Sequence, residues 1–140
     1  MGDVAKGTLY LCSIRDLDMY EVLDDKFFIS RFVKDHASLR KYGFVQVADL
    51  SPSKKLVQGY LNLKKEGKWN KETFETWYRP LFQKEIKEVL ELRNALNQVY
   101  KLLKSGKDVV LACYCHDANM CHRLIIGEEF RKLGFSVNIR

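Results

Sequence analysis

The residues best suited to chemistry lie together near the C-terminus of the 140-residue chain. Three of the four cysteines and two of the three histidines fall within ten residues, and an arginine follows them. An apolar run over 109–114 precedes these residues and is typical of a buried strand, and helical apolar spacing resumes at Leu124. Strand, loop and helix in this order place side chains at the carboxyl edge of a parallel sheet, where open α/β folds bind ligands. The reactive side chains are those of Cys113, Cys115, His116, Cys121, His122 and Arg123.

A nucleophilic cysteine is one chemistry that this stretch could support. Cys115 and Cys121 lie between the strand end and the helix start, where the helix dipole and free N–H groups favour a thiolate. His116 or His122 could act as the base. The spacing differs from that of protein tyrosine phosphatases, whose arginine follows the cysteine after five residues, because Cys121 occupies that position after Cys115. Cys113 is expected to be buried and inert, and the alternative for Cys121 is also a small core residue.

A metal site is a second chemistry, and local geometry argues against it. Zinc takes four ligands from cysteine and histidine, and Cys113, Cys115, Cys121 and His122 could be counted as four. Cys113 and Cys115 would lie about 6–7 Å apart along the strand, with Cys113 inside the sheet. The side chains of two consecutive helical residues diverge by roughly 100°, which would separate Cys121 from His122. We therefore expect no metal and no other cofactor.

Anion binding is a third chemistry. Arg123 at a helix start can hold a phosphate or carboxylate in a bidentate fork, whereas the alternatives are a surface salt bridge for Arg123 and a capping role for His122. A second helix start, at Ser51–Pro52, also follows a predicted strand. If the strands over 8–14, 44–48 and 109–114 are neighbours, the candidate ligand-binding residues converge on one edge. These residues are Arg15, Ser51, Ser53, Lys54, His116, Asn119 and Arg123.

The elements that must position these residues alternate between strands and helices. Apolar runs predict strands over 8–14, 27–33, 44–48, 109–114 and 135–139. Helical spacing predicts helices that begin at Ser51–Pro52 and at Asn70, one over 86–103, and one from residue 124 to Gly134. The expected fold is a single α/β domain over 1–140, with three layers, a mostly parallel sheet and helices on both faces.

The net charge of +6 is concentrated in one segment. Residues 51–71 hold six lysines and one acidic residue, which favours an anionic partner such as a phosphate, a nucleotide or nucleic acid. The alternative is a solvated helix face. The sequence has no apolar run long enough to span a membrane and no apolar region typical of a secretory signal. Four cysteines without such a signal favour a reducing cytoplasm, and no membrane partner is expected.

A known family shares several of these stretches. They are Leu50–Leu56, Trp69–Tyr78, Val109–Tyr114 and the triplet Cys121-His122-Arg123. In these the chain resembles the YeaO-like family, domain of unknown function 488, over roughly residues 44–134. The resemblance implies the fold and the site rather than a reaction, because no activity is established for the family. It favours Cys121, His122 and Arg123, whereas many members carry glutamate at the position of Cys115.

The leading interpretation is a cytoplasmic α/β protein that binds a phosphate-bearing ligand at the carboxyl edge of its sheet. The ligand would be a nucleotide or a nucleic-acid end, with Arg123 and His122 holding the anion and Cys121 or Cys115 as the reactive group. The first alternative is a non-catalytic nucleic-acid or protein-binding module that uses the lysine-rich surface over 51–71. The second is a metal-stabilised domain. The sequence leaves open whether the protein is an enzyme.

Overall fold

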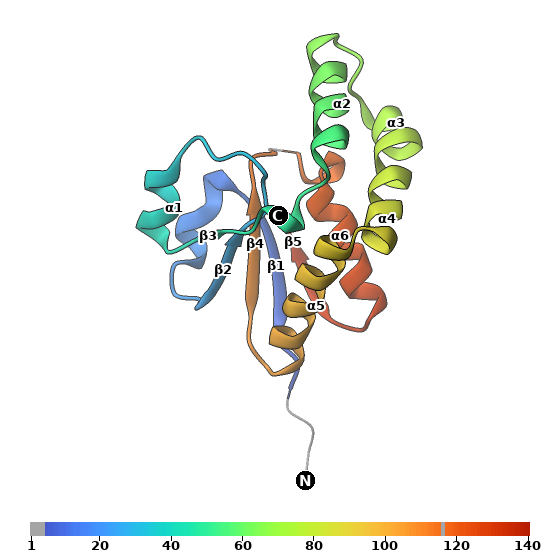
Figure 1. The fold of residues 1–140 in the computed structure, drawn as a ribbon. Helices are drawn as coiled ribbons and strands as arrows, with labels where there is room; N and C mark the ends of the chain where they lie inside the picture. Colours follow the sequence, from blue (N-terminus) through green and yellow to red (C-terminus); the bar gives the residue numbers. More distant parts are fainter. Residues whose placement is uncertain (1–4, 116) are drawn as a thin grey trace.

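The computed structural model describes residues 5–115 and 117–140, and its centre is a five-stranded sheet in which all strand pairs are parallel. The order of the strands is β3-β2-β4-β1-β5 (Figure 1). Their bounds are β1 (Thr8–Ser13), β2 (Asp25–Phe28), β3 (Val45–Gln46), β4 (Val109–Cys113) and β5 (Ser136–Ile139). Strand β4 is central and buried along its whole length. The predicted parallel α/β sheet is confirmed.

Helices cover both faces of the sheet (Figure 1). One face packs against the 3₁₀ helix Ile14–Tyr20 and α1 (His36–Tyr42), and the other against α5 (Leu90–Lys104) and α6 (His122–Lys132). Each face has its own buried cluster, so the inner strands are apolar on both sides, as parallel strands generally are. The first cluster includes Cys12, Phe28, Val110 and Ala112, and the second includes Leu9, Leu11, Leu111, Cys113 and Ile125.

A group of helices projects beyond the sheet and packs through aromatic rings. It consists of α2 (Lys54–Lys65), α3 (Lys71–Thr73), the π-helical turn Phe74–Tyr78 and α4 (Arg79–Glu88). The rings of Tyr60 and Trp69 meet edge to face with centroids 4.6 Å apart. A Cβ added to Gly59 would lie 2.7 Å from the Trp77 ring, so α2 approaches the turn closely only because residue 59 is glycine. None of these or the other described helices is both long and apolar enough to cross a bilayer.

Several predicted boundaries are wrong, among them those of the strand expected over 27–33, which is Asp25–Phe28. The helix expected from Ser51–Pro52 begins at Lys54, because Ser53 is the N-cap and its Oγ accepts a hydrogen bond from the Leu56 N–H at 3.2 Å. The helix expected over 86–103 is two helices, since Val89 has an extended backbone (φ −86°, ψ 112°). The strand expected over 44–48 is a two-residue edge strand, and β2 and β4 separate it from β1. Of the three strands whose adjacency was needed for convergence, β1 and β4 are neighbours, but β3 is adjacent to neither of them.

Candidate functional site

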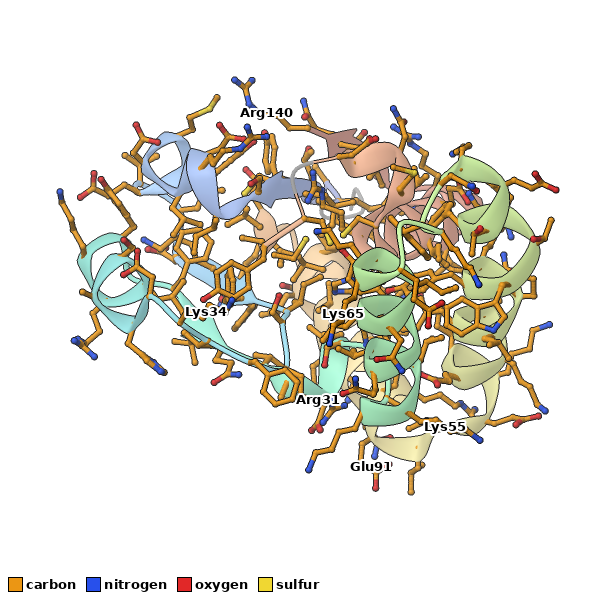
Figure 2. All side chains as sticks on the ribbon, turned by 90° about the horizontal axis from the view of Figure 1, so that it is seen from above. Arg31, Lys34, Lys55, Lys65, Glu91 and Arg140 are labelled. Atoms are coloured by element: carbon orange, nitrogen blue, oxygen red, sulfur yellow. The ribbon has the colours of Figure 1, made fainter. Side chains whose placement is uncertain are left out.

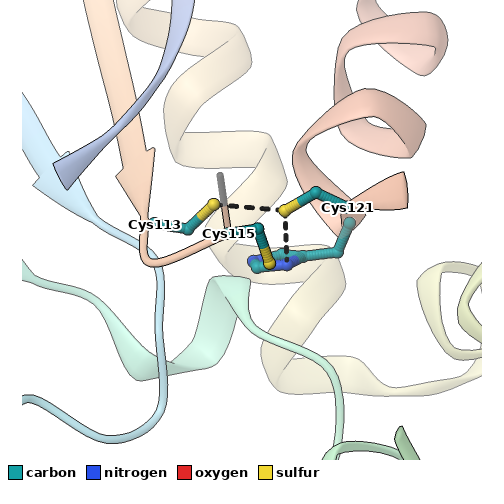
Figure 3. Close-up of side chains that lie close together, drawn as sticks. Cys113, Cys115 and Cys121 are labelled. Atoms are coloured by element: carbon teal, nitrogen blue, oxygen red, sulfur yellow. Dashed lines mark hydrogen bonds between the residues drawn. The ribbon is translucent and has the colours of Figure 1, made fainter. Parts of the chain in front are cut away.

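The end of β4 and the start of α6 bring two sulfur atoms and an imidazole together. Cys113 is the last residue of β4, Cys121 is the N-cap of α6 and His122 is the first helical residue. All three are buried, with 0 %, 1 % and 5 % of their surface exposed. The Sγ atoms of Cys113 and Cys121 are 3.1 Å apart, and Cys121 Sγ is 3.5 Å from His122 Nδ1 (Figure 3). The loop between β4 and α6 therefore places the end of β4 next to the start of α6.

Cys115 completes a group of four possible metal ligands. One ligand atom from each of Cys113, Cys115, Cys121 and His122 lies within 4.8 Å of the other three. The predicted divergence of the Cys121 and His122 side chains is wrong. Cys121 is not a helical residue, because its backbone is extended (φ −134°, ψ 150°), so the helical angle of about 100° does not separate the two side chains. We name these four residues the thiol cluster.

The imidazole of His122 is oriented by a backbone carbonyl. Its Nε2 lies 2.9 Å from the carbonyl oxygen of Ile29, and the Phe82 ring packs against it edge to face. Because a carbonyl oxygen can only accept, Nε2 carries the hydrogen, and a neutral ring then presents the lone pair of Nδ1 toward Cys121. Burial lowers the pKa of His122, which keeps the ring neutral. Metal-binding histidines are commonly fixed in this way.

Arg123 is fully buried beside the thiol cluster. Its Nη1 donates to the Cys115 carbonyl at 2.6 Å and to Cys113 Sγ at 3.1 Å, and its Nη2 donates to the Arg140 carbonyl at 3.0 Å. Its Nε is buried and has no hydrogen-bond partner within the described part of the chain. The guanidinium fork that the sequence assigned to an anionic ligand thus contacts protein acceptors and ties the loop to the last residue of the chain.

The three thiols of the cluster differ in how readily they ionise. Burial opposes ionisation of Cys113, but hydrogen bonds from Cys115 and Cys121 and the charge of Arg123 outweigh it and hold its pKa well below the usual range. The hydrogen bond with Cys113 raises the pKa of Cys115 to about 12, and burial raises that of Cys121. Cys113 is buried as predicted, and its sulfur is the one on which a negative charge is best stabilised.

The second predicted anion site contains a carboxylate of the protein itself. The backbone N–H of Ser53 donates to Glu85 Oε1 at 2.8 Å and its hydroxyl donates to Oε2 at 2.6 Å. Ser51 is buried, and its hydroxyl donates to the Ala48 carbonyl at 2.5 Å. Lys54 is exposed in the first turn of α2. The two Ser53 donors that were expected to face a ligand at the start of α2 are therefore engaged by Glu85, and the Ser51 hydroxyl is engaged by Ala48.

The other predicted ligand-binding residues differ in their surroundings. Arg15 is exposed in the 3₁₀ helix that follows β1. Asn119 is exposed in the short 3₁₀ helix Ala118–Met120, and its carbonyl accepts a hydrogen bond from Lys71 at 2.7 Å. His116 lies outside the described residues. Of the predicted site residues, the structure brings Cys115, Cys121 and His122 together with Cys113 in the thiol cluster and places Arg123 beside it.

The lysine-rich segment forms an exposed surface along α2 and into α3. Lys55 and Lys65 are exposed on α2 (Figure 2). At the C-terminal end of this lysine-rich segment, Lys68 pairs with Glu66 at 3.6 Å and Lys71 pairs with Glu75 at 3.0 Å. An anionic partner on this surface stays a prediction.

Sequence reasoning missed three groups that shape the site. The Ile29 and Arg140 carbonyls are backbone atoms, and backbone atoms leave no mark on a residue pattern. Glu85 lies 32 residues from the N-cap that it contacts, so no capping motif links it to Ser53. Only a correct N-cap assignment for Cys121 could have indicated the thiol cluster beforehand.

Comparison with known proteins gives a family for most of the chain. A family model described as "DUF488-N3a: Active DUF488-N3 subclade" matches residues 18–134. The matched range contains the whole thiol cluster and Arg123. No curated protein matches the chain.

Proposed function

The chain belongs to the family of domain of unknown function 488, and we propose that it binds a thiophilic divalent ion such as zinc at the thiol cluster. The observation that carries the proposal is the mutual approach, within 4.8 Å, of three sulfur atoms and one imidazole nitrogen. Three cysteines and one histidine are an established donor set for zinc. In a tetrahedral site with Zn–S bonds of about 2.3 Å the sulfurs lie about 3.8 Å apart. The Cys113–Cys121 separation of 3.1 Å thus needs only a small widening.

The charge of Arg123 matches this ion. Three thiolates around a divalent ion carry a net charge of −1 (2 − 3), and a buried charge without a partner costs several kcal/mol. The guanidinium of Arg123 supplies the compensating charge, with Nη1 at 3.1 Å from Cys113 Sγ and 3.9 Å from Cys121 Sγ. The hydrogen bond of His122 to the Ile29 carbonyl adds the outer contact that orients a histidine ligand.

Burial of the cluster favours a structural ion. Cys113, Cys121 and His122 are buried and Cys115 is half-buried, and four protein ligands leave no open position for a substrate. The ion would join the end of β4, the loop after it and the start of α6. The function supported best is therefore a domain whose carboxyl edge is held together by a bound metal.

Metal content tests this proposal directly. Protein purified without chelator is expected to contain about one zinc ion per chain, as a site with four protein ligands requires. Cys113→Ser and Cys121→Ser should each lose most of it, because a serine hydroxyl is a poor zinc ligand. Cys12→Ser is the matched control, since Cys12 is equally buried but belongs to the cluster on the other face of the sheet. A wild-type protein that contains no metal, even after refolding with zinc, would refute the proposal.

One observation favours a second function, the binding of a phosphate-bearing small molecule or nucleic-acid end. Arg123 Nε is buried and lacks a partner in the described chain, and it could donate to an anion. If it does, millimolar phosphate or mononucleotide should raise the melting temperature of the wild-type protein by mass action. No rise with either compound would remove this second function.

A further inference from the structure

Two sulfur atoms of the thiol cluster are closer than a shared metal would hold them. Cys113 Sγ and Cys121 Sγ are 3.1 Å apart, whereas a disulfide bond is about 2.05 Å long, so bond formation needs an approach of about 1 Å. We propose that the thiol cluster is a site of reversible oxidation by peroxide, in which Cys113 and Cys121 form a disulfide. The effect of this disulfide on metal binding rests on the proposed function, because Cys113 and Cys121 would also be metal ligands.

Cys115 gives the oxidant a route to the buried pair. It is half-buried, whereas the other three cysteines of the chain are buried. Its Sγ lies within 4.8 Å of the ligand atoms of Cys113 and Cys121. A small peroxide can therefore react first at Cys115, and the oxidation can pass to the buried pair by thiol–disulfide exchange.

The reaction balances with hydrogen peroxide as the two-electron oxidant. Cys115 loses its thiol proton to solvent and attacks one peroxide oxygen, the O–O bond breaks, and a sulfenic acid and hydroxide form. Cys121 in turn loses its thiol proton to solvent and attacks the Cys115 sulfur, an S–S bond replaces the S–O bond, and a second hydroxide leaves. The Cys113 thiolate then attacks the Cys121 sulfur and releases Cys115 as a thiolate. Two protons from solvent convert the two hydroxides to water.

Arg123 is placed to assist the final exchange. Its Nη1 lies 3.1 Å from Cys113 Sγ, and a cation at this distance favours the thiolate that must attack. Arg123 Nη1 also donates to the Cys115 carbonyl at 2.6 Å. This hydrogen bond fixes the guanidinium relative to Cys115, the cysteine at which the peroxide reacts first. The disulfide removes two of the four ligands, so oxidation should release the ion.

The test treats purified, metal-loaded protein with hydrogen peroxide, alkylates the free thiols and maps the peptides by mass spectrometry. The expected product has a Cys113–Cys121 disulfide, alkylated Cys115 and alkylated Cys12, and dithiothreitol should restore all four thiols. A chromogenic chelator should detect about one released zinc ion per disulfide, because each protein holds one ion. Cys115→Ser should form the same disulfide severalfold more slowly, whereas Cys12→Ser should react at the wild-type rate.

A parallel reaction with chelator-treated protein separates the two proposals. If the wild-type protein never binds metal and the disulfide still forms, the metal proposal fails and the oxidation site stands. If metal binds but peroxide gives no disulfide, or gives one that includes Cys115 as its stable product, the oxidation site is overturned. An unchanged rate in Cys115→Ser would overturn the route through Cys115.

Discussion

Removing the bound ion with a chelator should lower the melting temperature of the protein by about 10–20 °C. A ligand present at about a thousand times its dissociation constant stabilises the folded state by about 4 kcal/mol, and in a chain of this size each kcal/mol shifts the melting temperature by roughly 3–5 °C. The physical reason lies in the site itself. Without an ion, the ends of the loop are joined by weaker contacts such as the Cys113–Cys121 contact and the hydrogen bonds of Arg123.

The measurement is a thermal melt of the wild-type protein before and after chelator treatment, and again after zinc is restored. Cys121→Ser is the control, because a protein that lacks a ligand should already melt at the lower temperature and should not respond to chelator. Equal melting temperatures for wild-type protein with and without chelator, at a verified difference in metal content, would show that the ion does not stabilise the fold.

Arg123→Ala should lower the free energy of unfolding by about 3–5 kcal/mol, the range for removing one partner of a buried charged network. Arg123 is fully buried, and its loss leaves the Cys115 and Arg140 carbonyls without this donor. It also removes the positive charge beside Cys113. Arg123→Lys should recover only part of the loss, because an ammonium group cannot replace a planar fork with several fixed donors.

Urea denaturation of the wild-type protein, Arg123→Ala and Arg123→Lys measures the change in the free energy of unfolding. Arg131→Ala is the matched control on the same helix, since Arg131 is exposed and donates one hydrogen bond, to the Val137 carbonyl at 3.1 Å. That change should cost about 1 kcal/mol or less, as exposed hydrogen bonds usually do. A loss below about 1 kcal/mol for Arg123→Ala would mean that the buried guanidinium does not hold the loop.

The parts of the fold that could be predicted are those written into local residue patterns. The apolar run of β4 identified a fully buried strand, because a parallel strand covered on both faces needs no polar alternation. Helix α6 followed from its apolar spacing and ends beside Gly134, whose φ of +89° is a conformation that glycine adopts readily. Strand order was beyond local patterns, because pairing between distant segments depends on the whole packing.

The candidate site shows how one boundary residue can reverse a chemical conclusion. The sequence identified the four residues of the thiol cluster and then rejected them as ligands. The rejection assumed that Cys121 is helical, whereas as an N-cap it has an extended backbone that turns its sulfur toward Cys113. Helix ends are the least certain part of a sequence-based assignment, and here the last residue before the helix determines the geometry.

The most direct test of the metal centre is X-ray absorption spectroscopy of the zinc-loaded protein. Zinc is expected to be bonded to three sulfur atoms at about 2.3 Å and to one nitrogen atom at about 2.0–2.1 Å. Cys115→Ser should lose one of the three sulfur ligands, and Cys12→Ser should give the wild-type spectrum. A spectrum with only oxygen and nitrogen ligands, or one that is unchanged when cysteines of the thiol cluster are replaced, would contradict metal binding at this cluster.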